Sequence, residues 1–293
     1  MIDELKPKNG IYTAFNKAIV TDSSIRFKDS NIEAKTLHAL AYKYIRPNKG
    51  IEVFSYSSIK EDISYFDKKD IIDTIDEFCR SKEIDISIYS KDSNNKELIN
   101  KYFNLMYIEQ IPMTFNCLLK KFHILLNSNK IRLEYDMVIL DECADLTEVT
   151  LEIFKLINSR KKLVLGDKYQ NIYGFMNTVN AFDLLENTIE FKLTTSFRCS
   201  KHIAEIVEDY GITYLDKNFK FTGTDNIDNN NTVAYLSAYN SSGLLSASKL
   251  INNKTSFSLL KDTKELFSLP LALYNVKKGN PVYEKRFNYL EKE

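Results

Sequence analysis

Two apolar runs in this chain end abruptly in acidic residues. The run in YDMVILDECAD (residues 135–145) ends at Asp141 and Glu142, and the run in LVLGDKYQNIYGF (residues 163–175) ends just before Asp167. Short runs of this kind predict strands buried on both faces, as the strands of a parallel sheet are. Because such sheets bind ligands just beyond the carboxyl ends of their strands, the acidic residues are candidate ligand contacts.

The segment between the two runs predicts one amphipathic helix. Its apolar positions follow helical spacing, and we expect them to face the sheet. These positions are Val149, Ile153, Leu156 and Ile157. Asp145, with Glu148 three positions later, has the spacing of a capping box at the start of that helix. The two strands and the helix together predict a strand–helix–strand unit.

The pattern upstream of this unit predicts one short strand and several helices. Residues 11–14 are the strand candidate, and residues 35–44 have helical spacing. From residue 46 to residue 110 the composition is charged and the spacing helical, which indicates a helical insertion. Thr114 is placed to start a helix that leads into the strand at residues 137–140.

The pattern downstream predicts a further strand and helix, followed by a linker. Residues 190–194 predict the strand, Ser200 is placed to cap the helix, and Gly211 is placed to end it. The polar, Asn-rich run at residues 223–231 is typical of a linker. A second α/β segment is expected to begin at Thr232.

Composition narrows the class of protein. Hydrophobic residues make up 44% of the 293 residues, as in an ordinary globular protein. Lys and Arg number 40, and so do Asp and Glu, so any nucleic-acid binding must come from a local patch and from stacking. The four dispersed cysteines indicate reduced thiols. With no membrane-length apolar run and no signal peptide, we expect an intracellular protein of the cytoplasm or nucleus, without a membrane partner.

The chemistry at the two strand ends favours a nucleotide bound with a metal ion. Paired carboxylates suit Mg²⁺, because hard cations take oxygen ligands beside phosphates. A phosphate-binding loop would need a glycine followed by Lys-Ser or Lys-Thr. None of the eight glycines has that context, so we expect this sequence to lack the phosphate cradle.

Five segments, taken in order, resemble motifs of the UvrD/Rep-type superfamily-one DNA helicases, most closely the F-box DNA helicase branch. The segments are TAFNKAI (13–19), KTLHALAY (35–42), DECAD (141–145), GDKYQNIYGF (166–175) and LTTSFRCS (193–200). They resemble, respectively, the first DNA-contact motif, the threonine-histidine motif, the Walker B box, the GDxxQxIYxF box and the motif whose arginine reaches the nucleotide. The match runs from Gly10 to about Gly211.

The resemblance implies a fold and a domain arrangement. The fold is an α/β, RecA-like parallel sheet with a helical insertion, followed by the start of a second RecA-like domain. The first domain would comprise residues 1–45 and 111–222, incomplete at its N-terminus, with the insertion at 46–110. Residues 232–293 would be the partial second domain.

The same resemblance implies roles at the nucleotide. Asp141 would hold Mg²⁺, and Glu142 would act as general base on the attacking water. Gln170 would sense the γ-phosphate of ATP, and Arg198 would neutralise its developing charge. Ala144 stands where the family has glutamine, and Met176-Asn177 replace its usual Arg-Gly.

The resemblance also implies contacts with single-stranded DNA. The aromatic residues expected to stack on its bases are Phe15, Tyr173 and Phe175. The further expected contacts are Asn16, Lys17, Thr36 and His38. Without the resemblance, the two later aromatics would be interpreted as packing residues, and the histidine fits a surface hydrogen-bonder equally well.

Three hypotheses follow from these patterns. The first is an ATP-dependent DNA helicase or translocase, inactive as this chain alone, whose phosphate loop comes from a partner or an upstream segment. The second is a binding module for single-stranded DNA that has lost ATP turnover. The third is a degenerate helicase fragment without an independent role.

Overall fold

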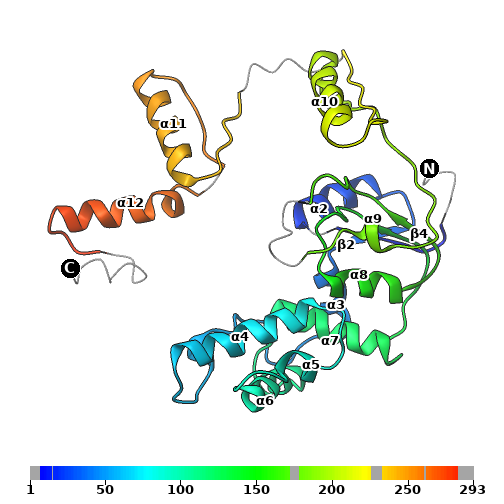
Figure 1. The fold of residues 1–293 in the computed structure, drawn as a ribbon, viewed down its shortest axis with the longest axis vertical. Helices are drawn as coiled ribbons and strands as arrows, with labels where there is room; N and C mark the ends of the chain where they lie inside the picture. The colour runs from blue at the N-terminus through cyan, green and yellow to red at the C-terminus, as the bar shows by residue number, and fades with distance from the viewer. Residues whose placement is uncertain (1–6, 15, 172–177, 226–232, 261, 283–293) are drawn as a thin grey trace. The chain divides into compact units, whose positions relative to one another are not determined.

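The computed structural model describes residues 7–14, 16–171, 178–225, 233–260 and 262–282. The chain divides into two compact units, residues 1–190 and residues 191–293, which are described separately. Figure 1 shows the elements of both. In the part of the chain so described, no helix combines the length and apolar character needed to cross a membrane.

The first unit is built on a four-stranded parallel sheet. Its strands are β1 (Gly10–Thr13), β2 (Ile32–Lys35), β3 (Glu134–Leu140) and β4 (Asn158–Val164). Their order across the sheet is β2-β1-β3-β4, and every neighbouring pair is parallel. The fold is therefore α/β and is consistent with a RecA-like sheet, as the sequence predicts.

Helices connect these strands and cover the sheet. Those of the first unit are α2 (Lys17–Arg26), α3 (Leu37–Ile45), α4 (Tyr65–Arg80), α5 (Ser87–Ser90), α6 (Lys96–Tyr107), α7 (Phe115–Asn127), α8 (Glu148–Leu156) and α9 (Ala181–Leu184), with the 3-10 helix η1 (Tyr56–Ser58) before α4. Helix α2 lies on one side of the sheet, and α3, α7 and α8 lie on the other (Figure 1).

The alternation of side chains along the strands explains the two layers. Ile11 and Val138 point into the larger core, which they share with α3, α7 and α8. Tyr12 and Ile139, one position later in each strand, point into the smaller core beneath α2. Successive residues of a strand face opposite sides of a sheet, so one short apolar run fills both cores.

The segment from 46 to 110 is helical, as the sequence predicts, and packs on α7. The buried residues of α4 and α6 join the larger core. Lys120 of α7 is fully buried, and its ammonium group donates to the backbone oxygens of Ser81 (2.6 Å) and Glu83 (2.7 Å) just beyond α4. The buried lysine therefore binds carbonyls at the C-terminal end of that helix.

The start of α8 differs from the expected capping box. Thr147 is the N-cap, without a side-chain cap hydrogen bond, and Asp145 instead accepts from the hydroxyl of Thr178 at 3.3 Å. Leu146 pairs with Val179 in an antiparallel bridge. Because Leu146 takes part in this bridge, the helix begins only after it. The apolar stripe of α8 is buried as predicted, apart from Leu156, which is half-buried.

The second unit contains α10 (Lys201–Tyr214), α11 (Asn240–Asn252) and α12 (Thr263–Lys277). Ser200 caps α10 as predicted, its side chain accepting from the backbone N–H of Ile203. The strand predicted at residues 190–194 is wrong; the nearest pairing is an isolated bridge between Thr195 and Thr222.

Three further expectations concern the second unit. Gly211 does not end α10, which continues to Tyr214. Between 233 and 239 the backbone is not a strand. Residues 191–222, assigned from sequence to the first domain, lie in the second compact unit. The domain boundaries stay a prediction.

Candidate functional site

The carboxyl ends of all four strands meet at one edge of the sheet. The register places Lys35, Thr13, Leu140 and Val164 in a row across β2, β1, β3 and β4. Two motif segments begin at Thr13 and Lys35 themselves, and two begin just after Leu140 and Val164, at Asp141 and Gly166. Ligands of parallel sheets bind at this edge. The topology therefore brings the segments that resemble nucleotide-contact motifs close to those that resemble DNA-contact motifs.

Asp141 is held on both carboxylate oxygens at the end of β3. The buried hydroxyl of Tyr12, on neighbouring β1, donates to Oδ2. The backbone N–H of Glu142 donates to Oδ1 at 2.9 Å. Burial, together with the bond to Asp141, raises the pKa of Tyr12 to about 12, so the phenol keeps its proton at neutral pH. Sequence reasoning missed Tyr12, because a tyrosine in a buried strand reads as packing.

Glu142 adopts a left-handed backbone conformation, with φ of 55°. A non-glycine residue in this region costs about 1–3 kcal/mol and persists only where its surroundings enforce it. Here the next residue, Cys143, donates its N–H to the oxygen of Leu165 at 3.1 Å and accepts from the N–H of Ala181 at 3.0 Å. The turn after β3 is therefore fixed to the chain that leaves β4.

Gly166 lies at the closest approach of the two strand ends. A Cβ at this position would lie 3.0 Å from both the N and the Sγ of Cys143. Because Gly166 has no side chain, the chain that follows β4 can pack against the turn that carries Asp141 and Glu142.

The segment after Gly166 forms a turn around Asp167. The backbone N–H of Gln170 donates to the oxygen of Asp167 at 3.0 Å, and its side-chain amide donates to Oδ2 at the same distance. Asn171 donates to the oxygen of Ala144 at 2.9 Å, a second link between the two strand ends. Gln170 is exposed at the same sheet edge as Asp141 and Glu142.

The donor set can be tested against a Mg²⁺-nucleotide. Mg²⁺ usually binds through one or two carboxylates together with waters and substrate phosphates. Among the described residues, no group of three or more His, Cys, Asp or Glu could hold a metal ion by itself. A lone partly exposed Asp141 beside exposed Glu142 therefore fits an ion that arrives with a nucleotide, and it does not fit a resident structural metal.

Arg198 belongs to the second unit. It follows the Thr195–Thr222 bridge, is exposed, and donates its backbone N–H to the hydroxyl of Ser196 at 3.2 Å. Its expected role at a γ-phosphate stays a prediction.

The expected DNA-contact residues of the first unit lie at helix starts along the same edge. Asn16 caps α2, its side chain accepting from the N–H of Ala18 at 2.8 Å, and Lys17 is the exposed first residue of that helix. Thr36 caps α3, accepting from the N–H of Ala39 at 3.1 Å. Two helix N-termini thus point to the edge where the strands end, an arrangement that favours anions.

His38 lies two residues after Thr36 and packs against Phe115 at the start of α7. The two rings meet edge to face with centroids 5.6 Å apart. Burial lowers the pKa of His38, so this imidazole is neutral at pH 7. Phe115 is 59% exposed, and sequence reasoning did not identify it as a site residue. The only indication in the sequence is its position directly after Thr114, the N-cap of α7.

Phe115 also lines a hollow on this unit. The hollow has a volume of about 450 Å³ and lies between α4, the start of α7 and the chain before η1. Its lining is Ile51, Glu52, Val53, Phe54, Ile72, Ile75, Asp76, Thr114, Phe115 and Asn116. A hollow of this size with a mainly apolar lining and a few polar groups resembles small-molecule sites in general.

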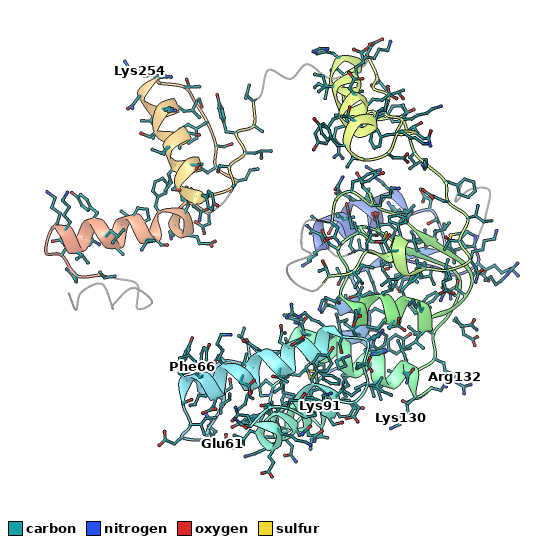
Figure 2. All side chains as sticks on the ribbon, in the orientation of Figure 1. Glu61, Phe66, Lys91, Lys130, Arg132 and Lys254 are labelled. Atoms are coloured by element: carbon teal, nitrogen blue, oxygen red, sulfur yellow. The ribbon has the colours of Figure 1, made fainter. Side chains whose placement is uncertain are left out.

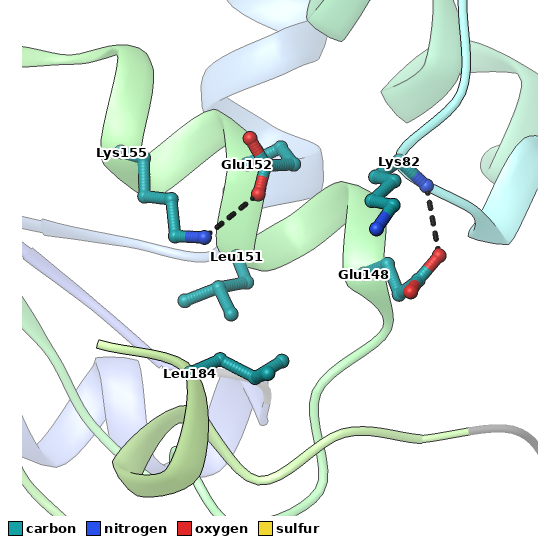
Figure 3. A pocket seen from close by; sticks show the side chains of 6 residues that line it. All are labelled: Lys82, Glu148, Leu151, Glu152, Lys155 and Leu184. Carbon is teal, nitrogen blue, oxygen red and sulfur yellow. Dashed lines mark hydrogen bonds and ion pairs between the residues drawn. The ribbon is translucent and has the colours of Figure 1, made fainter. Parts of the chain in front are cut away.

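A second, smaller hollow of about 130 Å³ lies between α8, α9 and Lys82 (Figure 3). Both of its carboxylates are already bound to the protein: Glu148 accepts from the backbone N–H of Lys82 at 3.1 Å, and Glu152 pairs with Lys155 at 2.9 Å. These contacts fix the start of α8 and leave little negative charge for a ligand.

Three expected site residues lie outside the described residues: Phe15, Tyr173 and Phe175. Their stacking role stays a prediction. Of the remaining eight, seven are in the first unit. Six of these follow strand ends at one edge: Asp141, Glu142, Gln170, Asn16, Lys17 and Thr36.

Comparison with known proteins points to DNA helicases. No family model matches the sequence. The chain is 25% identical over 266 residues to F-box DNA helicase protein 1 of Schizosaccharomyces pombe, covering 75% of this chain and 30% of that protein. It is 25% identical over 240 residues to F-box DNA helicase 1 of Gallus gallus, covering 70% of this chain and 23% of that protein. The chain thus spans less than a third of either relative, and the similarity indicates a distant helicase-related family.

Proposed function

We propose that this chain is the DNA-facing part of an ATP-dependent DNA helicase or translocase of the UvrD/Rep type. In this proposal Asp141 holds Mg²⁺ brought with the nucleotide, and Glu142 and Gln170 face its γ-phosphate. The phosphate loop comes from another segment or subunit, since the printed sequence contains no glycine followed by Lys-Ser or Lys-Thr. The chain alone therefore turns over little ATP.

One observation carries the proposal. The register of the parallel sheet aligns the ends of four strands, and that row puts the expected DNA contacts Asn16 and Thr36 at the same edge as Asp141. Such proximity would let a nucleotide bound at Asp141 act directly on a DNA strand held at Asn16 and Thr36. The similarity to two F-box DNA helicases supports the same conclusion.

Phe115 extends the proposed DNA face. It is exposed, it contacts the expected DNA residue His38, and it borders the 450 Å³ hollow. Stacking of a base on an aromatic ring contributes about 1–3 kcal/mol. We therefore include Phe115 among the residues that bind an unpaired base.

A second candidate function is a DNA-binding module without ATP turnover. It is favoured by the contacts of Asp141, whose oxygens already accept from Tyr12 and from the backbone of Glu142. Gln170 is likewise bonded to Asp167. These bonds occupy part of the hydrogen-bonding capacity of the carboxylate and the amide, and they leave less of it for a nucleotide.

DNA binding is tested by fluorescence anisotropy with labelled oligo-dT at two salt concentrations. Lys17→Glu, at the sheet edge, is compared with Lys28→Glu, which follows the other end of α2; both lysines are exposed. We expect micromolar or weaker binding that falls with salt, weakened about threefold or more by Lys17→Glu and little by Lys28→Glu. Equal effects of the two variants, or no binding at all, would contradict the proposal.

ATP turnover separates the two candidate functions. A DNA-stimulated ATPase assay is run on the purified chain, with and without a protein or peptide that carries a phosphate loop. Turnover that appears only on addition and is lost in Glu142→Gln supports the helicase; no turnover under either condition supports the binding module. Turnover near 1 s⁻¹ by the chain alone, on the order of ordinary phosphoryl-transfer enzymes, contradicts the need for an added loop.

A further inference from the structure

Tyr12 is held between the sheet and α2. It is 5% exposed, and its ring lies in the smaller core with Ile32, Met137 and Ile139. Phe27, the C-cap of α2, meets the ring edge to face with centroids 5.3 Å apart. Because this packing fixes the ring, the hydroxyl group at its end has a fixed position as well.

The strand register directs the side chain of Asp141 to the same side of the sheet as Tyr12. Tyr12 of β1 pairs with Ile139 of β3, and Asp141 comes two residues later. Every second residue of a strand faces the same side, so the carboxylate meets the phenol on the side of α2. The backbone N–H of Asp141 donates to the oxygen of Thr13 at 2.9 Å. Both the main chain and the side chain of Asp141 are therefore tied to β1.

A second buried tyrosine binds a carboxylate in the helical layer. The hydroxyl of Tyr102, a residue 3% exposed, donates to Glu61, and Glu61 also pairs with Lys101 at 2.6 Å. Glu61 lies at the outer end of the helical layer, away from the sheet (Figure 2). The negative charge of Glu61 is therefore matched within the protein.

The carboxylate of Asp141 is held in the same way, but its charge is not matched. Its two oxygens accept from the Tyr12 hydroxyl and from the N–H of Glu142, both neutral donors, and no Lys or Arg of the described residues forms an ion pair with it. Neutral donors fix the orientation of a carboxylate and leave its charge for a cation, whereas an ammonium group would offset that charge. Metal-binding carboxylates are typically hydrogen-bonded in this manner.

We propose that Tyr12 is a positioning residue for the metal site: its hydroxyl sets the orientation in which Asp141 receives the Mg²⁺ that comes with the nucleotide. The inference rests on the proposed function, which assigns the ion to Asp141, and it adds a residue outside the motif segments. Loss of such a hydrogen-bonding partner typically lowers metal affinity about 10–100-fold. We expect the lower end of that range, because the N–H of Glu142 still holds the other oxygen.

The test measures the binding of Mn²⁺ with ATPγS to the full chain, together with the phosphate-loop carrier of the ATPase assay, by the relaxation enhancement of water protons. Mn²⁺ is a paramagnetic substitute for Mg²⁺ that also takes oxygen ligands. Tyr12→Phe removes the hydroxyl and keeps the ring, and Tyr102→Phe does the same at the matched pair in the helical layer. Asp141→Asn measures the binding that occurs elsewhere.

We expect Tyr12→Phe to need about tenfold more Mn²⁺ for half-saturation and to reach the same final enhancement as the parent. Tyr102→Phe should bind as the parent does. A positioning role shifts the Mn²⁺ concentration at half-saturation, whereas a merely structural role lowers the folded fraction and with it the final enhancement.

The outcomes separate this inference from the proposed function. If the parent and Asp141→Asn bind Mn²⁺ equally, Asp141 holds no ion, and the proposed metal role fails together with the inference. If Asp141→Asn weakens binding and Tyr12→Phe does not, the inference alone is overturned. Equal weakening by Tyr102→Phe also overturns it, because the loss of any buried hydroxyl would then suffice. A lower final enhancement at unchanged half-saturation overturns it as well, since Tyr12 would then act only on folding.

Discussion

The two compact units differ in how they bury their apolar residues. In the first unit, a continuous core runs from the sheet through α3, α7 and α8 into the helical layer, and large side chains such as Phe78, Phe122 and Phe154 are fully buried. In the second, the buried residues are mostly small. They are Ala204, Gly211, Ala247, Ser268, Ala272 and Val282.

The helices of the second unit have apolar faces that stay open. On α10, Ile203, Ile206, Tyr210 and Tyr214 follow helical spacing and are 51%, 58%, 59% and 70% exposed. An amphipathic helix is stable in water only when such a face is covered. The first unit can therefore support a site with fixed geometry, whereas the described part of the second does not cover its own helices.

The sharpest test of this difference is the loss of one phenylalanine in each unit. Phe122→Ala removes a fully buried ring from α7 and should destabilise the first unit by about 3–5 kcal/mol. Phe191→Ala removes a ring that is 85% exposed and should change stability by less than about 0.5 kcal/mol. Urea unfolding followed by hydrogen exchange measures both, and equal losses would show that the units are equally packed.

A lysine replacement tests the buried polar contacts of the first unit. Lys120→Met leaves the oxygens of Ser81 and Glu83 without their donor, at a cost of about 1–3 kcal/mol. Lys249→Met, at an exposed position on α11, is the control and should have little effect. If urea unfolding showed Lys120→Met to be more stable than the parent, the buried ammonium group would be destabilising in the native protein, contrary to this prediction.

One glycine in each unit should respond to alanine with opposite sign. At Gly166 the added Cβ meets the backbone N and the sulfur of Cys143 at 3.0 Å, so we expect destabilisation of about 1–2 kcal/mol. At Gly243, inside α11, the nearest atom is a side-chain oxygen of Ser237, and the gain in helix propensity should stabilise by about 0.5–1 kcal/mol. Melting of the two variants checks this, and a stabilising Gly166→Ala would contradict the close approach of the strand ends.

Acid should weaken the first unit through His123 of α7. Burial, and then the nearby ammonium of Lys120, lowers the pKa of His123 to about 4, from an ordinary value of 6.5. Above pH 6.5, neutral His123 makes its full contribution to the free energy of unfolding. This contribution is lost as the pH falls toward 4, because between these two pH values only the unfolded chain binds a proton at His123. We expect a loss on the order of 1 kcal/mol between pH 7 and pH 5.

The control for this prediction is His123→Gln, which lacks the titrating ring. Its stability should change less than that of the parent over the same pH range, in urea unfolding at fixed ionic strength. Parallel pH profiles for parent and variant would remove His123 as the cause.

Short-range signals predicted several elements in both units. The apolar run before Asp141 predicted β3, and the caps Thr114 and Ser200 predicted the starts of α7 and α10. Each of these depends on a few neighbouring residues. The register that puts Thr36 at the same edge as Asp141 depends on pairing between residues far apart in sequence. From the sequence, only the expectation of a parallel sheet indicates that these two residues lie at one edge.

The errors arise where a distant contact decides local structure. Gly211 lies inside α10 because the ring of Phe219 packs there; a Cβ would lie 2.2 Å from that ring. Asp145 is not a cap because the bridge between Leu146 and Val179 delays the helix. Tyr12 gave no sequence signal, since its partner Asp141 is 129 positions away.

The central claim is that DNA binds the first unit at the carboxyl edge of its sheet. Photocrosslinking of the full chain to oligonucleotides that contain 4-thiothymidine, followed by peptide mapping, tests it directly. The account predicts crosslinks in residues 13–19, in residues 35–42 and at Phe115. Crosslinks confined to residues 191–293, or to the opposite ends of the strands at Gly10 and Glu134, would contradict it.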